Sequence, residues 1–111
     1  MSVDQVDKID VISTAPNGKV MLTISDHLPW DDANEHLMIL QNKINSYLSF
    51  IESGQIFEDY PNAQNSKLAI RVCIKYEPNN TALRFLDLCR DTILEADIGF
   101  SWQIIREQTE I

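Results

Sequence analysis

The sequence predicts an α+β fold, a two-layer sandwich in which a four-stranded mixed sheet carries both helices on one face. Four short runs alternate apolar and polar residues, and two longer runs have an apolar stripe with a period near 3.6. These runs follow the order β-β-α-β-α-β. With 111 residues and no linker or repeat, the chain is expected to be a single domain, residues 1–111, with residues 1–8 as an irregular arm.

The first half is expected to hold a β-hairpin and a long helix. Asn17-Gly18 separates two β-rich runs, KIDVIST (8–14) and KVMLTIS (19–25), and this dipeptide favours a tight hairpin turn. An apolar stripe at steps of three and four predicts a helix at about 31–53, which Gly54 ends. Residues 55–66 are then expected to be a loop that packs down through its aromatic side chains.

The second half is expected to add a strand, a helix and a last strand. KLAIRVCIKY (67–76) alternates cleanly, residues 81–97 have a helical stripe, and FSWQIIR (100–106) alternates again. Right-handed crossovers would make the last three strands parallel, but the long loop before 67–76 would also allow a reversal, so the strand order stays open. The sheet face without helices, with Ile12, Thr23 and Arg71 assigned to it, would meet either solvent or a second copy in a homodimer.

The charge distribution excludes nucleic acid as the expected partner. The net charge is −8, and residues 1–66 hold ten acidic side chains against three basic ones. Such a surface repels phosphate backbones and attracts a basic partner, although an acidic surface also simply keeps a protein soluble. The apolar runs are too short for a membrane span, and the polar start MSVDQVDKID has no signal-peptide pattern, so a cytoplasmic location is expected.

No cofactor is expected. The two cysteines, Cys73 and Cys89, lie within predicted regular elements and are expected to be reduced thiols, and no Cys-x-x-Cys spacing is present. The sequence also has no glycine-rich phosphate loop.

The segment SDHLPWDDANEHL (25–37) holds the residue types of a metal or acid–base site. Asp32 and His36 lie four residues apart, so they would share a helix face and are the weak candidates for metal ligands. The structural interpretation explains more of the residues, because Asp31 or Asp32 would cap the helix and the other acids would lie at the positive end of its dipole. We therefore expect no catalytic residues and no metal.

A second interpretation of these acids is a docking edge for a basic protein. Acidic and aromatic side chains precede and follow the long helix, and they would form one surface if its two ends met. The candidate partner-binding residues are Asp31, Asp32, Glu35, Glu52, Glu58, Asp59 and Tyr60.

The chain resembles a family of small bacterial proteins of unknown function. The shared pattern is a TISDHL-W turn, an EHL–LQ-K-N-Y–FIESG helix and a YP loop, and the similarity covers residues 9 to about 76. The resemblance implies a bacterial source and a stand-alone domain, and it assigns no activity to any residue.

Two functions of different class follow from these observations. The first is a non-enzymatic acidic binding protein, in its sharper form an immunity or antitoxin-like inhibitor of a basic bacterial toxin. The alternative is a small metal-dependent hydrolase or ligand-binding enzyme that uses the Asp/His cluster at residues 26–36, centred on Asp26, His27, Asp32 and His36.

Overall fold

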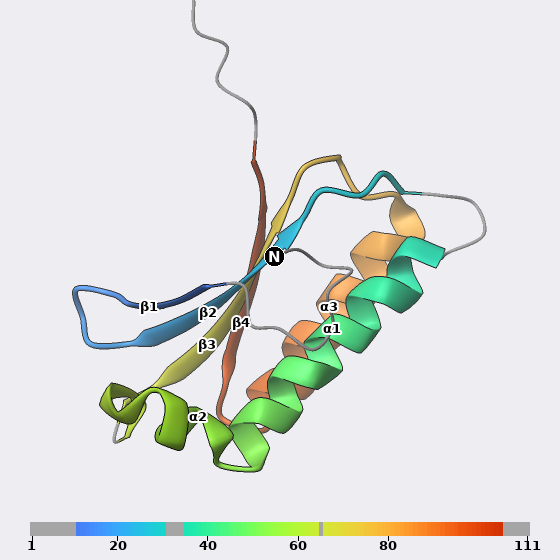
Figure 1. Ribbon diagram of the computed structural model, residues 1–111. Coiled ribbons are helices and arrows are strands. Elements are labelled where there is room, and N and C mark those ends of the chain that lie inside the picture. Colours follow the sequence, from blue (N-terminus) through green and yellow to red (C-terminus); the bar gives the residue numbers. More distant parts are fainter. Residues whose placement is uncertain (1–10, 31–34, 65, 106–111) are drawn as a thin grey trace, which may run out of the picture.

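A computed structural model describes residues 11–30, 35–64 and 66–105, and it has an α+β architecture with one open sheet (Figure 1). The sheet has four strands in the order β1-β2-β3-β4. The elements are β1 (Val11–Thr14), β2 (Val20–Asp26), α1 (Glu35–Glu52), α2 (Gln55–Asp59), the 3-10 turn η1 (Pro61–Ala63), β3 (Leu68–Ile74), α3 (Asn80–Leu94) and β4 (Gly99–Ile104).

The sheet is mixed, as the sequence predicts, and the structure settles its order. β1 pairs antiparallel with β2 through the predicted hairpin, in which Gly18 has φ +88° and its N–H donates to the Ala15 carbonyl. β2, β3 and β4 are all parallel to one another, because each crossover carries a long helix that returns the chain to the same edge.

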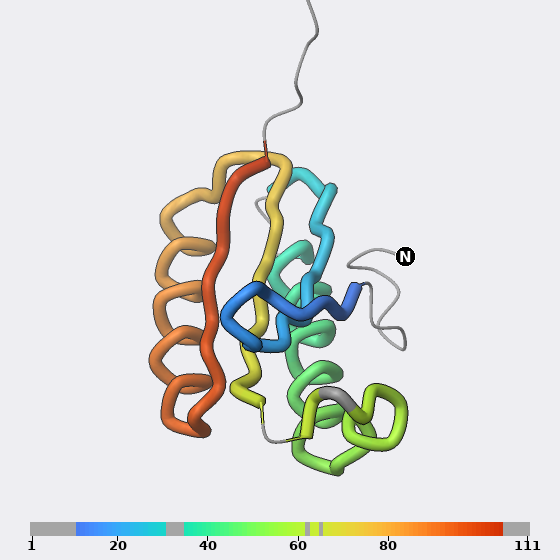
Figure 2. The backbone as a smooth tube through the Cα atoms, turned by 90° about the vertical axis from the view of Figure 1, so that its left-hand side faces the viewer, coloured from blue at the N-terminus to red at the C-terminus, as the bar shows by residue number. Residues whose placement is uncertain are grey.

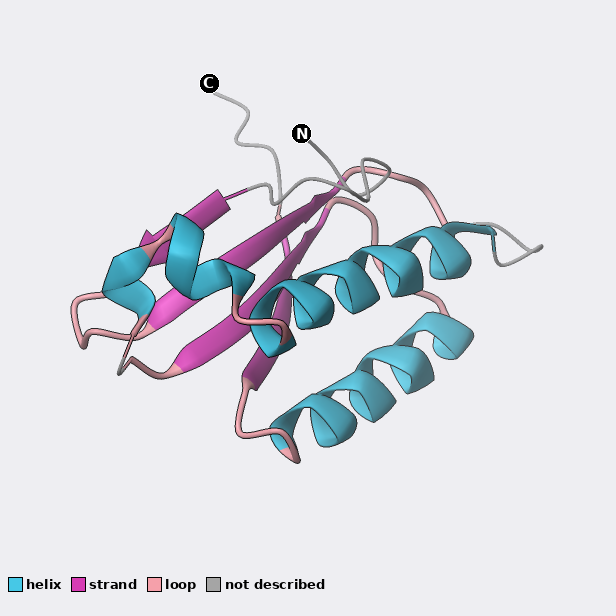
Figure 3. Ribbon diagram, turned by 60° about the horizontal axis from the view of Figure 1, so that its bottom comes forward, coloured by secondary structure: helices cyan, strands magenta, loops and turns pink. Residues whose placement is uncertain are grey.

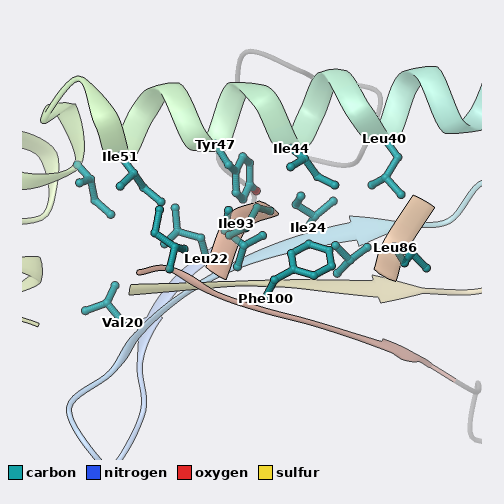
Figure 4. Packing of buried hydrophobic residues seen from close by; sticks show 14 of the residues in the cluster. Val20, Leu22, Ile24, Leu40, Ile44, Tyr47, Ile51, Leu86, Ile93 and Phe100 are labelled. Atoms are coloured by element: carbon teal, nitrogen blue, oxygen red, sulfur yellow. The ribbon is translucent and has the colours of Figure 1, made fainter. Parts of the chain in front are cut away.

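The two long helices, α1 and α3, run side by side against one face of the sheet (Figures 1 and 3). Strand alternation supplies that face with side chains: Leu22 of β2, Ile70 of β3 and Phe100 of β4 lie in one row across the sheet, and all three are buried. They meet Ile44 of α1 and Ile93 of α3 in a single hydrophobic core (Figure 4).

The register corrects one assignment on the opposite, open sheet face. Ile12 pairs with Leu22, and directly opposed residues share a face, so Ile12 lies on the helix side and packs against the core. Val11, opposite Thr23, and Ser13, opposite Met21, are the β1 residues on the open face. The sequence misassigned Ile12 because a four-residue edge strand gives too short an alternation to fix its phase.

The prediction of two helices is wrong, because residues 55–66 do not form only a loop. Gly54 ends α1 at φ +83°, the left-handed conformation expected of it, and α2 and η1 follow at once. Ile56 and Ala63 are fully buried in the core and hold this segment near the β1–β2 hairpin (Figure 2). A five-residue helix is too short to give a readable period, so burial rather than local pattern determines it.

Candidate functional site

The first candidate is a buried histidine–aspartate pair at the carboxyl end of β2. Asp26 is the last residue of that strand and faces the helical layer, while His36 lies in the first turn of α1. His36 Nε2 is 2.6 Å from both carboxylate oxygens of Asp26, and because an ionised carboxylate only accepts, the imidazole donates. The two side chains are 2% and 0% exposed, so the pair joins strand to helix inside the protein.

The loop between β2 and α1 closes over this pair. The Trp30 ring stacks on His36 with 3.7 Å between ring centroids, and its indole N–H donates to the Tyr76 carbonyl at 2.9 Å. The Leu28 N–H donates to Asp26 Oδ1 at 3.2 Å. Trp30 therefore fixes the loop to the chain beyond β3 and shields the pair from solvent, which favours a structural role.

The predicted metal candidates are not brought together in the described part of the chain. Asp32 lies outside the described residues, and His36 contacts Asp26, ten residues earlier, on its inner side. His27 is exposed on the loop. Among residues 11–30, 35–64 and 66–105, no three His, Cys, Asp or Glu side chains gather closely enough to hold a metal ion.

Lys43 is a buried charged residue that the sequence analysis missed. It is 0% exposed on the inner side of α1, with Nζ 5.5 Å from the centre of the Tyr47 ring. The Tyr47 hydroxyl in turn donates to the Thr23 carbonyl at 3.0 Å. The spacing of Lys43 in the sequence could have indicated its burial. His36, Leu40, Lys43 and Tyr47 are separated by steps of four, three and four residues, as the residues of the apolar stripe are.

The predicted docking residues fall into two separate groups. Glu35 is exposed at the start of α1 and Glu52 at its end, and at 1.5 Å per residue an 18-residue helix puts them about 26 Å apart. Asp31 and Asp32 lie outside the described residues. The two ends of α1 therefore do not form one compact surface within the described chain.

The group at the end of α1 is the denser one. Glu52, Glu58 and Asp59 are all exposed there, on two consecutive helices. Asp59 lines an open groove of about 630 Å³ between one flank of α1, α2 and the hairpin strand β1, whereas Glu52 lines a different hollow with Lys67 and Asp97. The groove is lined by Ile12, Ser46, Ser49, Phe50, Ser53, Gln55 and Asp59.

Tyr60 borders this region, but its side chain is held in place by contacts within the protein. Its hydroxyl is 2.9 Å from Thr14 Oγ1, and its ring is half-buried against the core. It therefore fixes α2 to β1, and apolar contact with a partner would come from Phe50 and Ile12 instead. Its role in partner binding stays a prediction.

The open sheet face has Arg71 at its centre. An Arg71 guanidinium N–H donates to Thr23 Oγ1 at 3.3 Å, while the buried Nε has no hydrogen-bond partner among the described residues. Both cysteine thiols are free, Cys73 buried on this sheet face and Cys89 half-buried on α3. Burial raises the pKa of the Cys89 thiol from 9.0 to about 11. A thiol held neutral in this way is a poor nucleophile.

Comparison with known protein families places the chain. A family model described as a family of unknown function, DUF6572, matches residues 1–106. The chain belongs to DUF6572. As the sequence pattern implies, this is a family without an assigned activity.

No curated protein and no solved structure matches this DUF6572 chain. Over the described residues, none of its helices combines the length and apolar character that a membrane span requires.

Proposed function

We propose that this DUF6572 protein is a non-enzymatic, cytoplasmic binding protein that holds a basic protein partner, as an immunity protein or antitoxin holds a basic bacterial toxin. The observation that carries the proposal is the pair of exposed carboxylates Glu58 and Asp59 on α2, of which Asp59 lines an open groove. Carboxylates around a concave surface attract and orient a cationic partner before contact.

The groove adds apolar contact to this charge. Phe50 and Ile12 line it and are half-buried, so each keeps apolar area that a partner would cover. The serines of the α1 flank and Gln55 supply hydrogen-bonding groups at the same site. An apolar floor with a charged rim is the arrangement that gives both affinity and a fast on-rate.

The rest of the chain increases the attraction. The net charge is −8, with most of the excess acid in residues 1–66, and the acids at the end of α1 belong to that half. A charge of this size acts over about a Debye length, roughly 8 Å at physiological salt. We therefore expect association with a basic protein to be fast and to weaken as salt is added.

The direct test starts from the partner. The tagged full-length chain is purified from its source cells, the bound proteins are identified by mass spectrometry, and the Kd of the basic protein found is measured by calorimetry at low and high salt. The proposal expects tight, salt-sensitive binding that inhibits that protein's toxic activity. A dissociation constant that does not change with salt would contradict it.

A matched pair of variants separates local docking from overall charge. Glu58→Lys/Asp59→Lys and Asp91→Lys/Glu95→Lys each change the net charge from −8 to −4, and all four residues are exposed. The first pair alters the proposed surface, whereas the second alters α3. We expect at least tenfold weaker binding for the first variant and only a modest change for the second. Equal losses would show that only total charge matters.

The alternative, a metal-dependent hydrolase that uses Asp26, His27, Asp32 and His36, has less support. Asp26 and His36 are sealed from solvent and contact each other under the Trp30 ring, so a substrate or metal ion would first have to displace Trp30. Metal analysis of protein purified without chelator tests it, together with thermal unfolding after zinc or manganese is added. Bound metal with a raised Tm would favour this alternative.

A further inference from the structure

The outer side of the helical layer, where α1 and α3 lie next to each other (Figure 3), has an unusually neutral surface for so acidic a chain. Between Glu35 and Glu52, the only charged residue of α1 is Lys43, which is buried. The exposed residues of that interval are all uncharged: Met38, Gln41, Asn42, Asn45 and Ser49. Depletion of charge is the compositional mark of the core of a protein interface.

A groove of about 170 Å³ runs along this surface between the two helices. Leu48 of α1 and Phe85, Leu88 and Cys89 of α3 line it, together with amide and hydroxyl side chains. Leu88 is 66% exposed and Met38 is 59% exposed, so apolar area remains open to water on both helices. Contact with another protein surface would remove this area from water, which is favourable.

The exposed charges along α3 are of both signs, and none of them is among the described residues that line the groove. Arg90 lies 3.7 Å from Asp87 and 3.9 Å from Asp91, and Arg84 supplies a second positive charge on the same helix. With Glu95, which directly follows the helix, two basic and three acidic residues are exposed from Arg84 to Glu95, while the chain as a whole carries −8. A second copy that approaches here meets charges of both signs instead of the large acidic excess of the whole chain.

We infer that this outer face of α1 and α3 is the contact surface between two copies of the chain. Two copies related by a two-fold axis bring the same residues together, so the surface must complement itself. Gln41, Asn42 and Asn45 meet that condition, because an amide both donates and accepts hydrogen bonds and can pair with its own copy. A neutral apolar groove is likewise complementary to itself.

The open sheet face is less suited to a two-fold contact. Arg71 lies at its centre, so a symmetric dimer would bring two guanidinium groups close together. The homodimer that the sequence allows is therefore assigned here to the helical layer. The proposed partner groove is on the other flank of α1 and stays open, so this inference does not depend on the proposed function.

The size of the face sets the expected affinity. α1 has 18 residues and α3 has 15. At 1.5 Å per residue and about 10 Å between axes, the two helices offer a face of roughly 20 by 25 Å. Stable dimers bury about 800 Å² per partner, which such a face approaches only when its side chains interlock. We therefore expect a reversible dimer with a Kd on the order of 10 µM.

Sedimentation equilibrium of the full chain, over concentrations from roughly a tenth to ten times that Kd, tests the inference. The weight-average mass is expected to rise from 12.7 kDa towards twice that value. In the variant Leu88→Glu, two new carboxylates would meet in the groove, and we expect at least a tenfold rise in Kd. A wild-type chain that stays monomeric throughout would overturn the inference.

Leu94→Glu is the matched control. Leu94 is on the same helix and is 61% exposed, close to the value for Leu88, but it lies outside the groove. Its association should equal that of the wild type, and circular dichroism should show that both variants fold. Equal weakening by both substitutions, or no weakening by Leu88→Glu, would refute the assignment. A dimer lost in Arg71→Glu but kept in Leu88→Glu would place the contact on the sheet instead.

Discussion

The contact between Asp26 and His36 gives the sharpest test of the fold. In Asp26→Ala, the imidazole of His36 loses its acceptor at 2.6 Å, and the Leu28 N–H loses its acceptor at 3.2 Å. The imidazole is shielded from water and the Leu28 N–H is partly buried, so solvent does not replace the bond to His36 without opening of the loop. We expect a large loss of stability and, at the same time, loosening of Trp30 over the pair.

The magnitude follows from burial. Each donor that loses a buried acceptor costs about 1–3 kcal/mol, so the two donors affected by Asp26→Ala should together cost roughly 2–6 kcal/mol. The free energy of unfolding of a domain of 111 residues is about 5–15 kcal/mol. Asp26→Ala should therefore lose a large part of that free energy and remain folded at 25 °C, except where the wild type is at the low end of the range. Asp26→Asn keeps an acceptor for Leu28 and should lose less, about 1–3 kcal/mol.

Urea unfolding, followed by tryptophan fluorescence and far-ultraviolet circular dichroism, measures the free energies. Asp91→Ala removes an exposed carboxylate and should change the free energy of unfolding by less than about 0.5 kcal/mol. The double variant Asp26→Leu/His36→Leu should lose less than the sum of its single variants, because neither side chain of the pair then leaves the other without a partner and only the Leu28 N–H loses its acceptor. A loss below about 1 kcal/mol in Asp26→Ala, or strict additivity, would refute the reasoning.

Three further predictions concern other elements. Gly54→Ala should destabilise the protein by about 1 kcal/mol in chemical denaturation, because Gly54 has φ +83° and alanine is strained there. Asn79→Ala should cost about 1 kcal/mol in the same assay, because the Asn79 side chain accepts from the Ala82 N–H at 2.8 Å and caps α3, whereas Asn79→Asp should keep most of the stability. Burial raises the pKa of Cys89 to about 11, so the rate of its alkylation should keep rising up to about pH 11 rather than pH 9, and a rate that levels off near pH 9 would contradict this. The free energy of unfolding should fall between pH 9 and pH 11, because only the thiol of the unfolded chain ionises in that range.

Much of the fold could be predicted from local pattern. Val20, Leu22 and Ile24 recur at every second position, and this period of two assigns them to one face of a strand wherever that strand lies in the sheet. Gly54 at the end of the long helix needs no tertiary information, because its left-handed conformation disfavours other residues. The short helix α2 was not predicted, because its burial depends on where the hairpin and α1 meet.

The candidate sites were harder to predict, because side-chain partners need not be close in sequence. Asp32 lies four residues, about one helical turn, before His36, so local spacing indicated Asp32 as its partner. In the fold, His36 instead contacts Asp26 at the end of β2. Lys43 looked like an ordinary surface residue, although it lies on the stripe that faces the core. His36 was therefore singled out with the wrong partner, and Lys43 was not singled out at all.

The sequence by itself determined the α+β class, the hairpin, the acidic character and the end of the first long helix at Gly54, because these depend on residue type and on periods of two and 3.6. The second long helix ends at Leu94, three residues before the predicted end. Only the tertiary structure decided the strand order, the pairing of Asp26 with His36, the division of the acidic residues between the two ends of α1, and the neutral groove between α1 and α3. The physical reason is that local conformation follows from neighbours along the chain, whereas burial and electrostatic partnership depend on segments that only folding brings together.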